Sequence, residues 1–394
     1  MTATTPATKK ATRKPKAANV RTKVQALRSE LRAQFRERDA VIDGTLTALM
    51  AGEHVLLLGP PGTAKSALAK GLCEAISGAD FFERLLTKFS TPEEVFGPVS
   101  LKGLENDRYG RKTSGKLPEA HVAFMDEIFK ANSSILNSLL SLVNERIFHN
   151  DGAPQACPLL TMVGASNELP EGQELEALYD RFTLRFWTDY IADRSNMKAM
   201  LLAQEPQVKT RLTLAELEAA KAEAEQVAFG NDEMEVLLDV KAATERAGIR
   251  VSDRRWRRII KSLKAYAYVC GDNAVGEDHF EILPDMMWRE PKERPTLAQE
   301  VGRIANPTAA KAQEILDAAS EMVGSLPPGE DRVAYLTAAA EANMALERMA
   351  NELRKLSNGK PSRKVTEAIA KVKELHETTQ RGAARAAGIG NFGF

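Results

Sequence analysis

Residues 59–66 read GPPGTAKS and place a lysine and a hydroxyl residue directly after a glycine-rich turn. The spacing nearly matches the phosphate-binding pattern G-x-x-x-x-G-K-[ST], whose backbone N–H groups cradle phosphates while the lysine reaches the outer ones and the hydroxyl ligates Mg²⁺. One position differs, because Ala64 stands where the pattern has glycine. If Ala64 has right-handed helical angles, its methyl group costs little, and we expect a working phosphate cradle. An incidental Pro/Gly turn is the alternative.

Two carboxylates end the apolar run HVAFMDE at residues 121–127. In parallel α/β sheets, ligands bind at the carboxyl ends of the strands. Asp126 is therefore predicted to hold the Mg²⁺ shell together with Ser66, and Glu127 to orient and activate an attacking water. Many surface strands end in acids, so this interpretation depends on the phosphate loop upstream. The predicted nucleotide contacts are Gly59, Pro60, Pro61, Gly62, Thr63, Ala64, Lys65, Ser66, Ala67 and Asp126.

Two further polar positions have both a functional and a structural interpretation. Asn167 follows the apolar run LLTMVGAS, where its amide suits contact with a γ-phosphate or the attacking water. A turn-forming asparagine before Pro170 explains the same residue equally well. Arg181 and Arg185 lie in the apolar segment LEALYDRFTLRFW, and a lone arginine in such a segment is usually expected to form a surface ion pair.

The elements that must position these residues alternate between short buried strands and helices. HVLLLG at 54–59 is too short for a typical helix and indicates a buried strand, and residues 66–78 have helical spacing that stops at Gly78. A strand, a loop and a helix in this order direct backbone N–H groups and the positive end of the helix dipole at one point. Residues 133–148 predict a core helix, and residues 21–51 predict amphipathic helices.

Composition favours a multidomain globular protein of a reducing compartment. The 394 residues are 43% hydrophobic, with 54 basic and 54 acidic residues. Residues 1–24 hold seven Lys/Arg and no acid, which predicts a disordered basic tail. Three distant cysteines and five scattered histidines show no metal-ligand spacing, and no apolar run approaches the length of a membrane span. We expect a cytoplasmic location.

The motifs GPPGTAKS, VAFMDE and GASNELP, in this order, resemble those of AAA+ ATPases. Longer stretches are similar to the MoxR group and most closely to its RavA branch. They are TKFSTPEEVFGPVS, TSGKLPEAHVAFMDEIFKA, ILNSLLSLVNERIF, SNELPEGQELEALYDRF and VSDRRWRRIIKSLKAYA. The resemblance covers about residues 25–290, and alanine commonly precedes the loop lysine in this branch.

The resemblance implies roles that spacing alone does not give. Asn167 matches sensor 1, and Arg181 matches the arginine finger that enters a neighbouring subunit's site. Arg254 matches the sensor 2 arginine, with Arg255 as the alternative. A trans-acting finger implies an oligomer, in this family usually a hexameric ring. The family's insert would fall within about 95–115, where the sequence predicts a protruding hairpin.

The predicted fold is α/β, with an AAA+ P-loop core whose central parallel sheet is flanked by helices. The predicted domains are a tail (1–24), the core (25–190), an α-helical lid (191–290) and a helical extension with a flexible C-terminus (296–394). In the extension, segments near 308–323, 331–356 and 362–386 are expected to be helical. The RavA branch continues into a mostly-β module, which this sequence lacks, so the partner of RavA is not carried over.

The resemblance implies ATP and Mg²⁺ as cofactors and a ring that remodels or matures a protein client with a von Willebrand A (VWA) domain partner. A DNA-directed motor or loader is the alternative, based on the basic tail and the RRWRR run at 254–258. Neutral net charge and the lack of a recognised DNA-binding motif count against it, and the helical spacing after Arg258 favours a lid helix. No base-reading motif is visible, and residues near Glu37–Ile42 are candidates for adenine contact.

Overall fold

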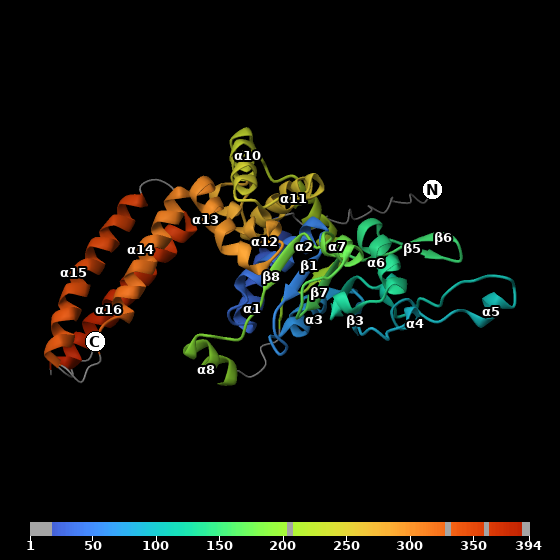
Figure 1. The fold of residues 1–394 in the computed structure, drawn as a ribbon, viewed down its shortest axis with the longest axis horizontal. Coiled ribbons are helices and arrows are strands. Elements are labelled where there is room, and N and C mark those ends of the chain that lie inside the picture. Colours follow the sequence, from blue (N-terminus) through green and yellow to red (C-terminus); the bar gives the residue numbers. More distant parts are fainter. Residues whose placement is uncertain (1–17, 203–207, 328–331, 358–361, 388–394) are drawn as a thin grey trace, which may run out of the picture. The chain divides into compact units, whose positions relative to one another are not determined.

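A computed structural model describes residues 18–202, 208–327, 332–357 and 362–387 (Figure 1). Its chain divides into two compact units. The first contains the described residues up to Ala228 together with Asp253–Ala274, and the second contains Phe229–Ser252 with the described residues from Val275 onward. The predicted lid is therefore divided between them, since its helix at Asp253–Cys270 belongs to the first unit.

A five-stranded parallel sheet forms the centre of the first unit, in the order β3-β4-β7-β1-β8. Its strands are β1 (Val55–Leu58), β3 (Phe81–Leu85), β4 (Val122–Asp126), β7 (Thr161–Ser166) and β8 (Leu184–Trp187). Every residue of β1 and β7 is buried, which explains their continuous apolar runs, because both faces of a parallel sheet are covered. The three strands predicted from sequence are confirmed.

Helices flank this sheet in the first unit (Figure 1). The helices of the first unit are α1 (Ala18–Gln34), α2 (Asp39–Ala51), α3 (Lys65–Glu74), α4 (Pro92–Phe96), α5 (Leu101–Leu104), α6 (Ser133–Glu145), α7 (Gln173–Tyr179), α8 (Arg194–Leu202), α9 (Leu214–Glu225) and α11 (Asp253–Cys270). Helix α2 packs against β1, β7 and β8, and α11 packs on α2, α9 and α1. Two short parallel strands, β2 (Ile76–Ser77) and β9 (Leu212–Thr213), pair beside them.

Helix α1 corrects part of the prediction for the N-terminal tail. The helix begins at Ala18, and Val20 and Val24 on its inner face are buried. The disordered tail predicted for 1–24 is therefore wrong for residues 18–24, where the apolar side chains at these two positions find a packing surface. The other residues of that predicted tail, 1–17, lie outside the described residues.

Two projections lie beside each other at one end of the sheet (Figure 1). One is the loop that carries α5, closed by a single bridge between Val99 and Arg111. The other is the antiparallel hairpin of β5 (Ile147–Asn150) and β6 (Ala153–Ala156). An ion pair of 2.8 Å joins Arg108 Nε to Asp151 Oδ2 and ties the two together. The hairpin predicted within 95–115 is thus a loop with a one-turn helix and one bridge.

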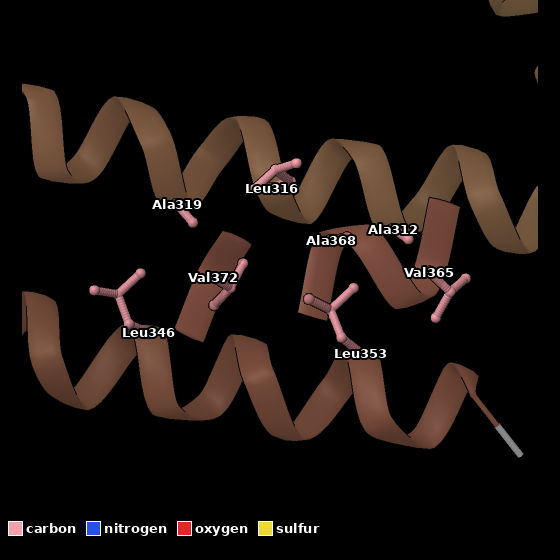
Figure 2. Close-up of a cluster of buried hydrophobic side chains, with 8 residues drawn as sticks. All are labelled: Ala312, Leu316, Ala319, Leu346, Leu353, Val365, Ala368 and Val372. Carbon is pink, nitrogen blue, oxygen red and sulfur yellow. The ribbon is translucent and has the colours of Figure 1, made fainter. Parts of the chain in front are cut away.

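The second unit is helical, as predicted for the end of the chain. It contains α10 (Asn231–Arg246), α12 (Pro284–Met287), α13 (Arg294–Ala305), α14 (Pro307–Gly324), α15 (Arg332–Leu356) and α16 (Arg363–Ala386). Helices α14, α15 and α16 form a three-helix bundle, with α15 antiparallel to the other two (Figure 2). Its core alternates alanine with leucine and valine: Ala312, Leu316, Ala319, Leu346, Leu353, Val365, Ala368 and Val372. The small alanines let the helices approach closely.

Candidate active site

The loop between β1 and α3 has the backbone geometry of a phosphate cradle. Gly59 has φ 135°, and a Cβ there would overlap the carbonyl oxygen of Thr188, so only glycine fits. Gly62 has φ 77° with open space around it. Helix α3 then begins at Lys65, which directs its first N–H groups toward the loop.

Ala64 differs from the sequence-based expectation. Its backbone is left-handed, with φ 64° and ψ 25°, and not right-handed helical. An L-residue in this region is disfavoured by roughly 1–2 kcal/mol, because its Cβ crowds the backbone. The usual glycine of the motif therefore has a conformational reason in this fold, and alanine keeps the same loop shape with some strain.

Lys65 folds back over the loop that precedes it. Its Nζ donates hydrogen bonds to the carbonyl oxygens of Gly59 at 2.6 Å and Pro60 at 3.1 Å, and the residue is 8% exposed. Burial lowers the pKa of this amine, while Asp126 and Glu127 act in the opposite direction. The ammonium group is thus held at the loop, close enough to the two carboxylates for their charges to stabilise it.

Three neighbouring strands deliver their polar residues to one edge of the sheet. Strands β4, β7 and β1 are adjacent and parallel, and they end at Asp126, Ser166 and Leu58. Strand β4 ends in the predicted site residue Asp126. Asn167 comes directly after β7, and Gly59 comes directly after β1. The sheet therefore brings the carboxylates, the amide and the phosphate loop to the same edge.

Glu127 is held by its neighbours in a specific arrangement. Asn167 Nδ2 donates to Glu127 Oε1 at 2.9 Å, and Lys130 Nζ lies 3.3 Å from Oε2. The Glu127 backbone is left-handed, with φ 52°, and its N–H donates to Asp126 Oδ1 at 3.0 Å. Strained backbone of this kind is often found at functional sites. Asn167 is thus in contact with Glu127, as a role beside an attacking water requires.

The oxygen donors at this edge are those that Mg²⁺ prefers. Ser66 is exposed in the first turn of α3, and Asp126 is half-buried at the end of β4. Within the described parts of the chain, no group of three or more His, Cys, Asp or Glu side chains could hold a metal ion. A site of one hydroxyl and one carboxylate fits a Mg²⁺ ion that takes its other ligands from phosphates and water.

Arg181 lies at the opposite edge of the sheet. It precedes β8, and Leu184 at the start of β8 pairs with Val55 at the start of β1. The phosphate loop follows the other end of β1, so this loop and Arg181 are separated by the length of the strands. Arg181 Nε is buried and has no hydrogen-bond partner among the described residues. The geometry keeps Arg181 away from the phosphate loop of its own chain.

Arg185 is not the surface ion pair expected of a lone arginine. It is 2% exposed, and its guanidinium lies 3.7 Å from the centroid of the Tyr179 ring. Its Nε and Nη2 donate to the carbonyl oxygens of Phe182 and Tyr179 at 3.2 and 3.1 Å. The expected surface ion pair is wrong because the folded chain places the Tyr179 ring and these two carbonyl oxygens around the guanidinium, where they stabilise the buried cation.

The two arginines weighed as sensor 2 have different surroundings. Arg255 is 4% exposed, and its Nη2 donates to Asp180 Oδ1 at 2.9 Å and to the Asp180 carbonyl at 3.1 Å. Arg254, one residue earlier in the first turn of α11, is exposed. Arg255 is therefore occupied within its own chain, and Arg254 remains the candidate for contact with a ligand.

Glu37 and Arg38, here called the strap, connect segments that are distant in the sequence. From the sequence, residues near Glu37–Ile42 are only candidates for adenine contact. Arg38 Nε donates to the Thr63 carbonyl at 3.4 Å, and its Nη2 donates to the Asp189 carbonyl. Glu37 accepts hydrogen bonds from the N–H groups of Ala192 and Asp193 at 2.9 and 3.0 Å. The strap thus ties the phosphate loop to the segment after β8, which no local sequence pattern could reveal.

Comparisons with known proteins agree with this geometry. Residues 22–227 match the family model described as the MoxR domain in the MoxR-vWA-beta-propeller ternary systems, and residues 233–301 match an AAA lid domain. An uncharacterized protein of Methanocaldococcus jannaschii is 43% identical over 299 residues, which are 75% of this chain and 80% of that protein.

Two more distant relatives are similar to the chain. The chaperone MoxR1 of Mycobacterium tuberculosis is 27% identical, with 64% of this chain and 70% of that protein covered. A solved structure from Cytophaga hutchinsonii, described as a "putative ATPase", has the same fold with a TM-score of 0.60 at 17% identity, covering 74% of this chain and 96% of that one. The phosphate loop, the strand-end carboxylates and these matches together show that the chain belongs to the MoxR group of AAA+ ATPases.

Proposed function

We propose that this chain hydrolyses Mg-ATP at a site completed by a second copy of itself. One copy supplies Lys65, Ser66, Asp126, Glu127 and Asn167, and the adjacent copy supplies Arg181. Arg254 is the proposed sensor 2 arginine. The observation that carries this proposal is that Arg181 lies at the sheet edge opposite to its own phosphate loop. A closed hexameric ring, the usual assembly of this family, would bring the two edges of successive copies together.

Each residue has a defined task in this site. Lys65 neutralises charge on the outer phosphates, and Glu127 orients and deprotonates the attacking water with Asn167 beside it. Ser66 and Asp126 would hold Mg²⁺, which shields the charge of the phosphate oxygens when it is bound. Arg181 stabilises the negative charge that the γ-phosphate gains in the transition state, so hydrolysis depends on assembly.

The motor is proposed to remodel or mature a protein client together with a VWA-domain partner in the cytoplasm. Support comes from the matched family, which is named for systems containing MoxR and vWA proteins, and from the chaperone relative. The DNA-directed alternative is less favoured, because two arginines of the RRWRR run, Arg255 and Arg258, form ion pairs with Asp180 and Glu53 inside the chain. The particular similarity to the RavA branch stays a prediction.

Mixing two inactive variants tests the shared site. Arg181→Ala keeps its own phosphate loop but offers no finger, and Lys65→Ala offers a finger but binds nucleotide poorly. Each alone should lose hydrolysis, by about 10³-fold or more for Arg181→Ala. Mixed rings contain some sites with an intact loop facing an intact finger, so we expect partial recovery of ATPase activity.

The control is a mixture of Lys65→Ala with Glu127→Gln, which carry their defects on the same side of the site. That mixture should recover nothing, because no interface in it has both residues intact on one copy. Light scattering confirms that the variants co-assemble. Absence of recovery with Arg181→Ala at every ratio, in rings that do form, contradicts the shared site.

A further inference from the structure

The turn that carries Arg181 is capped by guanidinium groups along its whole length. Arg185 donates to the carbonyl oxygens of Tyr179 and Phe182 at 3.1 and 3.2 Å. Arg255 donates to the carbonyl of Asp180 at 3.1 Å, and Arg258 donates to that of Arg181 at 3.2 Å. Four consecutive carbonyl oxygens, from 179 to 182, are therefore each bound to an arginine.

These three arginines, here called the carbonyl cradle (Arg185, Arg255 and Arg258), come from two elements of the first unit. Arg185 lies on β8 and stacks on the Tyr179 ring. Arg255 and Arg258 are three residues apart on α11 and therefore share one face of that helix. The strand and the helix thus both donate hydrogen bonds to the turn.

Three cations so close together repel one another, and the fold offsets this repulsion locally. The first of these carbonyls, that of Tyr179, ends α7, and the other three follow it directly, at the end of the helix where its dipole is negative. Asp180 Oδ1 lies 2.9 Å from Arg255, and Glu53 Oε2 lies 3.5 Å from Arg258. Burial, assisted by the charge of Arg255, lowers the pKa of Arg185 to about 9, so it stays protonated at neutral pH.

Arg181 differs from the cradle arginines in one respect. Its backbone is fixed, yet its side chain makes no hydrogen bond or ion pair within the described residues, and its Nε is buried without a partner there. The three cradle arginines, by contrast, donate hydrogen bonds to groups of their own chain. The backbone of Arg181 is thus fixed while its guanidinium has no partner among the described residues. This guanidinium can therefore bind an anionic group of another molecule.

We propose that Arg185, Arg255 and Arg258 are positioning residues that aim Arg181 at the nucleotide of the neighbouring copy. The inference rests on the proposed function, since it assumes that Arg181 is the finger. Helix α11 would then have two roles. It carries Arg254, the sensor 2 candidate, and through Arg255 and Arg258 it fixes the turn at residues 179–182 that carries Arg181. A finger displaced by about 1 Å can lose on the order of 100-fold in rate.

Arg258→Gln is the most informative substitution, because this side chain is 20% exposed and its loss leaves Arg185 and Arg255 in place. We expect kcat for ATP to fall by about 10–100-fold with little change in ATP affinity. Arg258→Lys keeps the charge and one donor and should recover part of the rate. Arg257→Gln, on the exposed side of the same helix, is the matched control and should keep the wild-type rate.

A double variant separates positioning from a general structural role. If Arg258 acts only through Arg181, then Arg181→Ala combined with Arg258→Gln should be no slower than Arg181→Ala alone. A mixture of Arg258→Gln with Lys65→Ala should regain activity, because the defect lies on the finger side. Arg255→Lys provides the same tests if Arg258→Gln does not fold, as judged by its Tm.

Three results would overturn the inference. They are an unchanged kcat in folded Arg258→Gln, a further loss in the double variant, or no recovery with Lys65→Ala when Arg181→Ala does recover with it. If Arg181→Ala itself fails to recover, the proposed function fails instead, so the two failures are distinguished.

Discussion

At the scale of single residues, the site depends on backbone conformations that L-residues rarely adopt. Ala64 and Glu127 both have left-handed angles, with φ of 64° and 52°. One shapes the phosphate loop and the other turns a carboxylate toward Asn167. Such strain persists only where the surrounding structure imposes it, and here it lies in two loops of the candidate site, one after β1 and one after β4.

Ala64→Gly should relieve the strain in the phosphate loop. The gain of about 1–2 kcal/mol from removing the Cβ is partly offset by the larger chain entropy of glycine in the unfolded state. We expect the free energy of unfolding to rise by roughly 0.5–1 kcal/mol, measured by urea titration, with ATP affinity retained. Ala67→Gly, in the right-handed helix α3, should lose about 1 kcal/mol, and a loss of similar size at Ala64 would refute the argument.

Glu127→Gln should separate nucleotide binding from hydrolysis. The amide keeps the shape of the carboxylate and can still accept from Asn167, but it cannot take a proton from water. We expect kcat to fall by about 10²–10⁴-fold while ATP affinity changes little, as measured by steady-state turnover and equilibrium titration. Glu168→Gln, a neighbouring exposed carboxylate at the same strand edge, should keep its rate. A turnover number close to wild type would remove Glu127 from the role of base.

At the scale of elements, a buried histidine joins segments at the sheet edge that faces away from the phosphate loop. His54 Nδ1 accepts from the Met162 N–H at 2.9 Å, while Nε2 lies 3.0 Å from the Val143 carbonyl oxygen and 2.6 Å from Arg146 Nη1. Arg146 donates to the carbonyl of Gly52 at 2.9 Å beside it. This junction connects the end of α2, the end of α6 and the start of β7.

The His54 junction makes stability dependent on pH. Burial, followed by the charge of Arg146, lowers the pKa of His54 well below 6.5, so the folded state keeps it neutral while the unfolded chain takes up a proton below that pH. Stability is therefore complete above about pH 6.5 and is lost as the pH falls, by up to about 1.4 kcal/mol per pH unit.

The measurement is the free energy of unfolding at pH 7.5 and 5.5, for wild type and for His54→Asn. The Asn oxygen can replace Nδ1 as acceptor from the Met162 N–H, and the side chain does not titrate. We expect wild type to lose about 1.4 kcal/mol more than the variant over this interval. Equal losses in the two proteins would show that His54 does not titrate on unfolding.

At the scale of the whole molecule, the proposed site is divided between opposite edges of the sheet, so the proposal makes assembly a requirement for catalysis. Lys65 and Glu127 lie at one edge, and Arg181 with its carbonyl cradle lies at the other. No helix in the described residues is long and apolar enough to cross a membrane. The separate three-helix bundle of α14, α15 and α16 lies beyond the residues matched by either family model.

Dilution should therefore lower the ATPase rate per subunit. A site shared between copies loses its finger when the assembly dissociates, so the rate should fall together with the assembled fraction seen by sedimentation. Arg181→Ala, whose residual rate does not use the finger, should show a rate per subunit that is independent of concentration. A wild-type rate that stays constant down to concentrations with only monomer would contradict a shared site.

The sequence alone determined three of the five strands of the central sheet, the position of the phosphate loop and the strand-end carboxylates, because these are local patterns of apolar runs, glycines and charges. The buried runs VLLL and VAFMD became β1 and β4, and Lys65, Asp126 and Asn167 came to one edge since parallel strands share their direction. The sequence-based resemblance also assigned the finger, a role that still awaits experiment.

Only the tertiary structure decided how Arg185, Arg255 and Arg258 are used. As single arginines in the sequence they read as surface charges or as a basic run, since nothing local shows that four carbonyls of one turn lie within their reach. The left-handed angles of Ala64 and the helix from Ala18 through residue 24 were decided in the same way. Each depends on contacts between segments far apart in the chain, which local patterns do not record.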